Sequence, residues 1–172
     1  VTASDGTALH THRWLPDGPP KAVVQIAHGM AEHSARYARL AEALTAAGYA
    51  VYADDHRGHG STASKADHGY FADHDGWDTV VADVRAVTDF AREENPGLPV
   101  FLLGHSMGGF LARAYVIEDS RELAGVVLSG TAGESATLSL AASGGGTTAV
   151  IAGSPIGAGI EKSEKSSAIG AA

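Results

Sequence analysis

The sequence predicts an α/β fold, a mostly parallel sheet with helices on both faces, preceded by a short β-ribbon. Three observations predict this fold. Short apolar runs typical of buried strands alternate with segments in which apolar residues recur at helical spacing. Glycine, proline or charged residues separate the segments. The alternation continues over about the first 130 residues, and strands that alternate with helices in this way form parallel sheets.

The strands are predicted from short apolar runs that turn residues bound. A turn at Asp5-Gly6 divides the first 14 residues into a ribbon whose second half is residues 8–14. Four later runs are rich in β-branched, aromatic and alanine residues, as expected of strands buried on both faces. They are residues 22–27, 49–53, 100–103 and 125–129.

Three helices are predicted between these strands. Residues 37–44 place Tyr37, Leu40, Ala41 and Leu44 at helical spacing, and Gly48 stands where a C-terminal cap belongs. Residues 77–91 form a second amphipathic pattern, which Asn95-Pro96-Gly97 ends. The third helix covers residues 107–117.

The composition changes after residue 130. Residues 131–172 consist mainly of Ala, Gly, Ser and Thr, and they include no aromatic residue, histidine, aspartate or arginine. We therefore divide the chain into a folded part, 1–130, and a tail, 131–172, that buries too little apolar area to fold alone. The tail is expected to be flexible, or to dock on a sheet edge or a partner chain through 150–151 or 156–160. An edge left unpaired after the strand 125–129 also predicts a homo-oligomer.

Charge and composition limit the classes of function. The net charge of −8 opposes nucleic-acid binding, which depends on neutralising phosphates. The chain has no cysteine, so it has no disulfide or thiolate metal site. No apolar run reaches the ~20 residues of a membrane span, and the first residues show no signal-peptide core. We therefore expect a soluble protein without a transmembrane segment, and the cytoplasm is the favoured location.

The pentapeptide Gly104-His105-Ser106-Met107-Gly108 matches the nucleophile elbow, G-x-S-x-G. It follows an apolar strand and opens a helix, which is the context that the chemistry requires. A tight strand-to-helix turn exposes the serine hydroxyl, and the free N–H groups of the helix start face developing negative charge. Ser106 is therefore the candidate nucleophile. The alternative is a glycine-rich turn with a capping serine.

Two further loops follow neighbouring strands on the same edge of the predicted sheet. His28-Gly29-Met30 offers the N–H of Met30, which with the N–H of Met107 would form an oxyanion hole. The histidine of this loop, His28, is interpreted as a buried, hydrogen-bonded side chain rather than as a direct catalytic group. The loop 55–61 is interpreted as structural, held by internal hydrogen bonds.

A polar cluster invites a metal hypothesis. It contains His68, Asp73, His74, Asp75 and Asp78. Its spacing matches no known ligand motif such as H-E-x-x-H, so a solvated loop and helix start is the preferred interpretation. We predict no metal and no cofactor.

Taken together, three motifs resemble the monoacylglycerol lipase and lysophospholipase branch of the serine α/β-hydrolases. They are His28-Gly29-Met30-Ala31-Glu32-His33 with Arg36-Tyr37, the segment Asp55-His56-Arg57-Gly58-His59-Gly60-Ser61, and Gly104-His105-Ser106-Met107-Gly108-Gly109. The resemblance covers about residues 1–130. It implies a serine esterase acting on monoacylglycerols, lysophospholipids or short acyl esters, with Ser106 as nucleophile and Met30 and Met107 as oxyanion donors. Other serine α/β-hydrolases, such as thioesterases and peptidases, share the elbow.

The sequence also departs from this family. Its members continue after the fourth strand into a cap, an aspartate and a histidine, whereas here the last aspartate is Asp119 and the last histidine is His105. The chain is therefore expected to be a truncated α/β-hydrolase that recruits its base from His28, His59 or a neighbouring subunit. The alternative is an impaired hydrolase that binds acyl ligands without efficient turnover.

Overall fold

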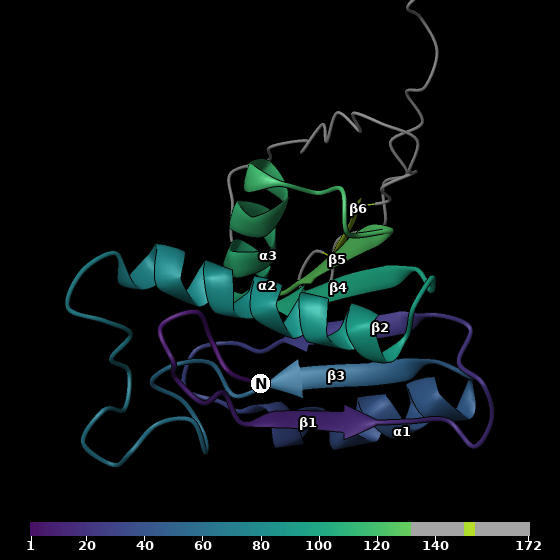
Figure 1. The fold of residues 1–172 in the computed structure, drawn as a ribbon, viewed down its shortest axis with the longest axis horizontal. Coiled ribbons are helices and arrows are strands. Elements are labelled where there is room, and N and C mark those ends of the chain that lie inside the picture. The colour runs from purple at the N-terminus through teal and green to yellow at the C-terminus, as the bar shows by residue number, and fades with distance from the viewer. Residues whose placement is uncertain (132–149, 154–172) are drawn as a thin grey trace, which may run out of the picture.

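A computed structural model describes residues 1–131 and 150–153, and six strands of these residues form one sheet (Figure 1). The strand order is β1-β3-β2-β4-β5-β6, and every neighbouring pair is parallel except β1 and β3. The strands are β1 (Thr11–Trp14), β2 (Val23–Ala27), β3 (Ala50–Asp54), β4 (Val100–His105), β5 (Gly125–Ser129) and β6 (Val150–Gly153). The helices are the short 3-10 helix η1 (Ser34–Tyr37), α1 (Ala38–Ala46), α2 (Gly76–Glu94) and α3 (Met107–Glu118).

Each strand and helix predicted between residues 22 and 129 is present, with ends shifted by a few residues. The helix predicted from residue 37 is preceded by one 3-10 turn, and α1 itself begins at Ala38. Gly48 follows α1 with a φ of +88°, so the residue predicted as a cap does adopt the left-handed conformation that glycine permits. No helix among residues 1–131 is both long and apolar enough to cross a membrane.

The N-terminal ribbon is shorter than predicted. Residues 1–9 form a small hairpin around Asp5-Gly6, with a bridge between Thr2 and Ala8. The continuation, β1, leaves this hairpin and pairs antiparallel with β3 at the edge of the main sheet. The sequence pattern alone did not distinguish one long ribbon from a strand that changes its partner, because both have the same alternation of side chains.

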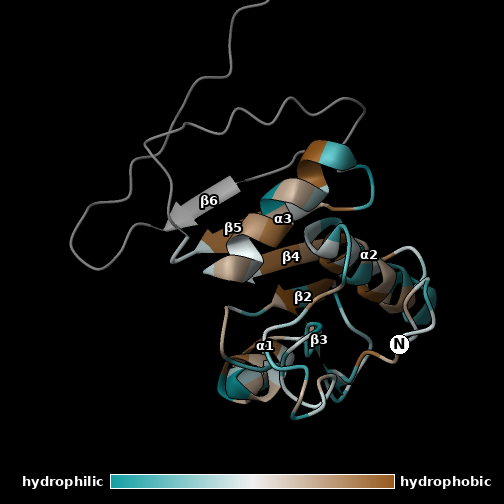
Figure 2. Cartoon of the chain, turned by 90° about the vertical axis from the view of Figure 1, so that its left-hand side faces the viewer, coloured by the Kyte–Doolittle hydropathy of each residue, from teal (hydrophilic) through white to brown (hydrophobic). Residues whose placement is uncertain are grey.

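Helices cover both faces of the sheet, as predicted. Side chains of α2 and α3 pack on one face against Val23, Tyr52 and Leu102. On the other face Ala41 of α1 packs with Ile26 and Val51. Figure 2 shows α1 on one side of the strands and α2 and α3 on the other. Successive residues of a strand point to opposite faces, and helices cover both faces of this sheet. Residues of β2 and β3 are therefore buried nearly throughout.

The edge beyond β5 is occupied by β6, which pairs with β5 in parallel from Val126↔Val150 to Ser129↔Gly153. This is the arrangement in which part of the tail docks on the sheet edge. The other candidate segment, 156–160, lies outside the described residues.

The homo-oligomer stays a prediction. We expect sedimentation equilibrium to give a mass of at least twice that of the 17.5 kDa chain. The reason is that, among the described residues, β1 and β6 are the two edge strands of the sheet, and unpaired edges recruit partners. A monomer at concentrations of about 100 µM would contradict it, because weak self-association becomes visible in this range.

Candidate active site

The elbow is a sharp turn between β4 and α3. Ser106 joins the two elements with φ 52° and ψ −115°, a backbone conformation that side-chain-bearing residues rarely adopt. Its N–H donates to the carbonyl of Ser129 in β5, and its carbonyl accepts from the N–H of Gly109. Ser106 is half-buried, and no described residue hydrogen-bonds to its hydroxyl. Backbone strain that surrounding bonds hold in place is typical of functional sites.

Close packing explains why two glycines flank the serine. A Cβ added at Gly104 would lie 2.3 Å from the carbonyl oxygen of Gly108. A Cβ added at Gly108 would lie 2.0 Å from the carbonyl oxygen of Ala27, at the end of β2. The first turn of α3 therefore rests directly on the backbone of β2, and this contact brings Ser106 to the loop that follows β2.

We expect Gly108→Ala to destabilise the fold by about 3 kcal/mol or more, since either the helix or β2 must move to admit the methyl group. Gly18→Ala is the matched control, because an added Cβ there meets no atom within 4 Å and the change should cost less than about 0.5 kcal/mol. Urea unfolding followed by circular dichroism measures both. Equal stability of the two variants would contradict the close contact between α3 and β2.

The loop after β2 lies against Ser106. A Cβ added at Gly29 would be 3.1 Å from the Cβ of Ser106. The next residue, Met30, has a side chain that is 68% exposed, whereas Met107 is buried at the start of α3. Neither the N–H of Met30 nor that of Met107 donates to another residue within 1–131. Within residues 1–131, neither predicted oxyanion donor is therefore committed to a protein acceptor.

Glu32 holds this loop in place, a role that the sequence analysis did not assign. Its Oε1 accepts hydrogen bonds from the N–H of Gly29 (2.5 Å) and the hydroxyl of Tyr37 (2.8 Å), and Oε2 pairs with Arg36 at 3.4 Å. Burial alone would raise the pKa of Glu32, but these donors lower it below the ordinary value. The carboxylate is therefore charged near neutral pH. Its position three residues after the glycine is the sequence signal of a side chain that accepts a hydrogen bond within its own loop.

His28, His56 and His59 form a cluster of three buried imidazoles, in which His28 stacks on His56 and meets His59 edge to face. The ring centroids of His28 and His56 are 4.1 Å apart, and those of His28 and His59 are 5.2 Å apart. Nε2 of His28 accepts from the backbone N–H of His56 (3.0 Å), so its Nδ1 carries the proton and donates to the carbonyl of Gly29 (2.7 Å). Burial and the neighbouring His56 lower the pKa of His28 to about 4.

These contacts bear on the two histidines considered as a recruited base. Both ring nitrogens of His28 are hydrogen-bonded within the loops, so no lone pair is available to Ser106. Nδ1 of His59 bonds to the carbonyl of Arg57, and the ring lines a cavity of about 440 Å³ beside Met30. This geometry favours the structural interpretation of His28 and leaves only His59 of the pair with an uncommitted nitrogen.

The low pKa of His28 predicts a pH dependence of stability. An unfolded histidine has a pKa of 6.5, so between about pH 6.5 and 4 the unfolded state binds more protons than the folded state. The contribution of His28 is complete above pH 6.5 and is lost as the pH falls towards 4, by about 1.4 kcal/mol per unit of pKa difference. His28→Asn does not titrate, so its free energy of unfolding should fall less over this range. Urea unfolding at several pH values tests this, and identical slopes would contradict it.

The loop 55–61 is held by hydrogen bonds, and many of its partners lie outside it. Oδ1 of Asp55 accepts from the N–H and hydroxyl of Ser34, and Oδ2 accepts from the N–H of Ser61. Arg57 donates to Asp83 of α2 and to Asp5 and Thr7 of the N-terminal hairpin. The loop thus joins three distant segments of the chain.

The side chain of His105 is directed towards the end of β5. Its Nδ1 lies 3.4 Å from the hydroxyl of Ser129, and its ring stands against Gly130. Within residues 1–131, therefore, no histidine makes a hydrogen bond to Ser106.

Among the described residues, no group of three or more histidine, aspartate or glutamate side chains has the geometry to hold a metal ion. In the polar cluster considered above, Tyr70 bonds to Asp73, and the carbonyl of Asp75 accepts from the N–H and hydroxyl of Thr79 at the start of α2.

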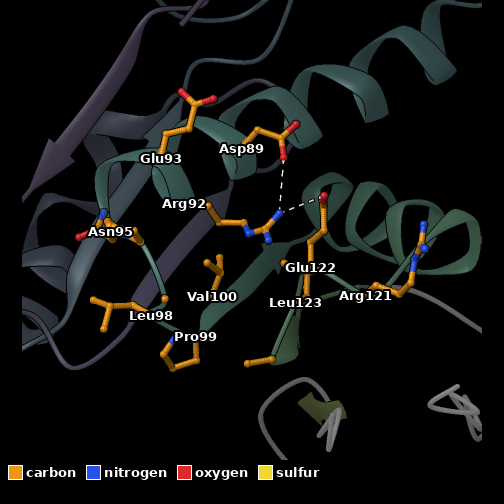
Figure 3. A pocket seen from close by; sticks show the side chains of 13 residues that line it. Asp89, Arg92, Glu93, Asn95, Leu98, Pro99, Val100, Arg121, Glu122 and Leu123 are labelled. Atoms are coloured by element: carbon orange, nitrogen blue, oxygen red, sulfur yellow. Dashed lines mark ion pairs between the residues drawn. The ribbon is translucent and has the colours of Figure 1, made fainter. Parts of the chain in front are cut away.

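A second cavity, of about 730 Å³, opens at the other end of the sheet (Figure 3). It lies where β4 begins, between the end of α2 and the segment before β5, and Arg92 pairs there with Asp89 and Glu122. Ser106 follows the carboxyl end of β4, so this cavity is at the opposite end of the strands from Ser106. Ligands of parallel α/β sheets bind at the carboxyl edge.

Comparison with known protein families identifies the family to which the chain belongs. The model of the serine aminopeptidase S33 family of hydrolases matches residues 18–154, which include all three motifs. The chain belongs to this family. This membership supports the resemblance to the α/β-hydrolases that the three motifs carried.

Two curated relatives of this S33 chain are lipases. It is 42% identical over 125 residues to the monoglyceride lipase of Homo sapiens. The matched region covers 73% of this chain and 40% of the relative. It is 44% identical over 119 residues to the monoacylglycerol lipase of Mycolicibacterium smegmatis. This matched region covers 69% of the chain and 41% of that relative. The resemblance to the monoacylglycerol lipase branch is confirmed. The chain spans about two fifths of the length of either relative.

Solved structures show the same fold for this S33 chain. A thermostable carboxyl esterase from Bacillus coagulans superposes with a TM-score of 0.70 at 35% identity, covering 77% of this chain and 43% of the esterase. The mostly parallel sheet and its helices are therefore those of an α/β-hydrolase.

Proposed function

We propose that this chain supplies the nucleophile and the oxyanion donors of a serine ester hydrolase. The observation that supports the proposal is the close approach of Ser106 to Gly29, because Met30, the proposed oxyanion donor, is the next residue of that loop. Membership in the S33 hydrolases and the similarity to two monoacylglycerol lipases support it. The proposed substrates are monoacylglycerols, lysophospholipids and short acyl esters.

In the proposed reaction Oγ of Ser106 attacks the carbonyl carbon of the ester. The carbonyl oxygen becomes an oxyanion, which the N–H groups of Met30 and Met107 stabilise. The Oγ proton passes to a base, collapse of the tetrahedral intermediate releases the alcohol, and water then hydrolyses the acyl-serine. His59 or a histidine of a neighbouring subunit is the proposed base, since His28 has both nitrogens bonded.

A second candidate is an acyl-binding protein with poor turnover. The observation that favours it is that no described histidine bonds to the hydroxyl of Ser106. Serine hydrolases that lose their histidine keep only a rate about 10³–10⁴ times that of water, from binding and the oxyanion hole.

Steady-state hydrolysis distinguishes the two candidates. Turnover of p-nitrophenyl butyrate and of a monoacylglycerol, compared with stoichiometric labelling of Ser106 by a fluorophosphonate, separates nucleophile reactivity from catalysis. Labelling with multiple turnovers supports the hydrolase, labelling without turnover supports the acyl-binding alternative, and an unlabelled Ser106 contradicts the hydrolase.

A further inference from the structure

One peptide group lies at the centre of the site. The carbonyl of Gly29 and the N–H of Met30 belong to the same peptide unit, and the described residues contain no cis peptide bond. In a planar trans peptide, C=O and N–H point in opposite directions. Whatever binds the Gly29 carbonyl therefore sets the direction of the Met30 N–H.

The group that binds this carbonyl is the ring of His28. Its Nδ1–H donates to the Gly29 oxygen at 2.7 Å, while its Nε2 is anchored by the backbone N–H of His56 at 3.0 Å. The ring is fully buried and stacked on His56. A buried ring held at both nitrogens and by stacking has one available orientation.

The sheet order gives the direction of the peptide. β2 lies between β3 and β4, so His56, which follows β3, and Ser106, which follows β4, lie on opposite sides of the end of β2. The Gly29 carbonyl bonds to a ring that stacks on His56. The N–H of Met30 consequently points to the other side, where the Cβ of Ser106 approaches Gly29.

Without this bond the peptide would be free to rotate. Glu32 holds the N–H of Gly29 but not its carbonyl, and glycine permits backbone angles that other residues do not. Rotation of the Gly29–Met30 peptide would replace the donor beside Ser106 with a carbonyl oxygen, which repels an oxyanion.

We propose that His28 is a positioning residue that locks the Gly29–Met30 peptide with the Met30 N–H directed at the Ser106 oxyanion site. The proposal rests on the function proposed above for Ser106. It assigns His28 a role in transition-state stabilisation through Met30, distinct from that of a base and from that of a core side chain.

Two substitutions separate the nitrogens of His28. His28→Asn places an amide N–H near the position of Nδ1 and keeps a donor to Gly29, but it has no acceptor for the N–H of His56. His28→Gln places an amide oxygen near the position of Nε2 and keeps that acceptor, but it has no group at the Nδ1 position. Both variants lose the stacked ring, so their losses of stability should be similar.

The readout is the second-order rate at which a fluorophosphonate labels Ser106, followed by mass spectrometry. The Ser106 oxygen–phosphorus bond forms, fluoride leaves and the hydroxyl proton passes to solvent or base, while the phosphoryl oxygen occupies the oxyanion site. Loss of one oxyanion donor costs about 10²–10³ in rate, so we expect a fall of about 10- to 100-fold for His28→Gln. His28→Asn should stay within about threefold of the wild type. Equal rates for the two variants would overturn the proposal.

A measurement independent of reactivity accompanies it. Long-range nitrogen–proton NMR correlation of the imidazoles should show His28 as the Nδ1–H tautomer near neutral pH, and an Nε2–H tautomer would overturn the proposal. The amide resonance of Met30 should shift more in His28→Gln than in His28→Asn. If wild-type Ser106 is not labelled, the proposed function fails, while the tautomer and the Met30 shift still decide whether His28 sets this peptide.

Discussion

Ser106→Ala should remove esterase activity and fluorophosphonate labelling almost completely, with a loss of about 10³-fold or more. The expected loss is large because the hydroxyl is the proposed attacking atom and no other described serine has a strained backbone with φ near +52°. Alanine fits the position, since the Ser106 hydroxyl makes no hydrogen bond to a described residue. The midpoint of thermal unfolding should change by only a few degrees.

The matched control is Ser4→Ala, which removes an exposed hydroxyl in the N-terminal turn. This variant should keep wild-type labelling and hydrolysis. Hydrolysis that survives in purified Ser106→Ala would show that the activity belongs to a different site or to a contaminating esterase.

The second large effect concerns stability. Arg57→Met should lower the free energy of unfolding by about 3–5 kcal/mol near neutral pH, the range seen when one member of a buried ion pair is removed. Its partner Asp83 is only 2% exposed, and burial raises the pKa of Asp83 even with Arg57 present. Loss of the guanidinium leaves a buried carboxylate unpaired and releases Asp5 and Thr7 of the N-terminal hairpin.

Arg121→Met is the control for this experiment. Arg121 also makes an ion pair with an aspartate, Asp119, but its side chain is 79% exposed, so its loss should cost less than about 1 kcal/mol. Protonation of Asp83 relieves the unpaired charge, so the Arg57→Met defect should shrink as the pH falls. A double variant, Arg57→Met with Asp83→Leu, should recover part of the loss. Equal costs for Arg57→Met and Arg121→Met in urea unfolding would contradict the importance of burial.

Much of the fold was predictable because the strands carry local signals. β3 is buried on both faces and is apolar apart from its terminal aspartate, and α2 shows an apolar stripe bounded by a proline and glycine turn. These patterns depend on residues a few positions apart. The path of β1 was not predictable, since its alternation fits a ribbon as well as an edge strand.

The roles of individual loop residues depend on contacts between distant segments. His28 and His59 both follow strands at the carboxyl edge, so the sequence offered them equally as a base. The partner of the His28 Nε2 is the N–H of His56, 28 residues away, and only that contact shows that both nitrogens of the ring are bonded. The loop 55–61 was expected to bond internally, but Arg57 reaches Asp83 and Asp5, 26 and 52 residues away.

The sequence by itself determined the α/β architecture, the family and the position of the serine. Each depends on local periodicity or on a short motif whose glycines must fit a tight turn. The tertiary structure alone decided what surrounds that serine. It placed Gly29 against Ser106, and it bound the ring of His28 to the Gly29 carbonyl. It also paired Arg57 with a buried aspartate of α2. Packing brings these groups together from separate elements. A hydrogen bond depends on the distance and angle between its donor and acceptor, which the sequence does not give.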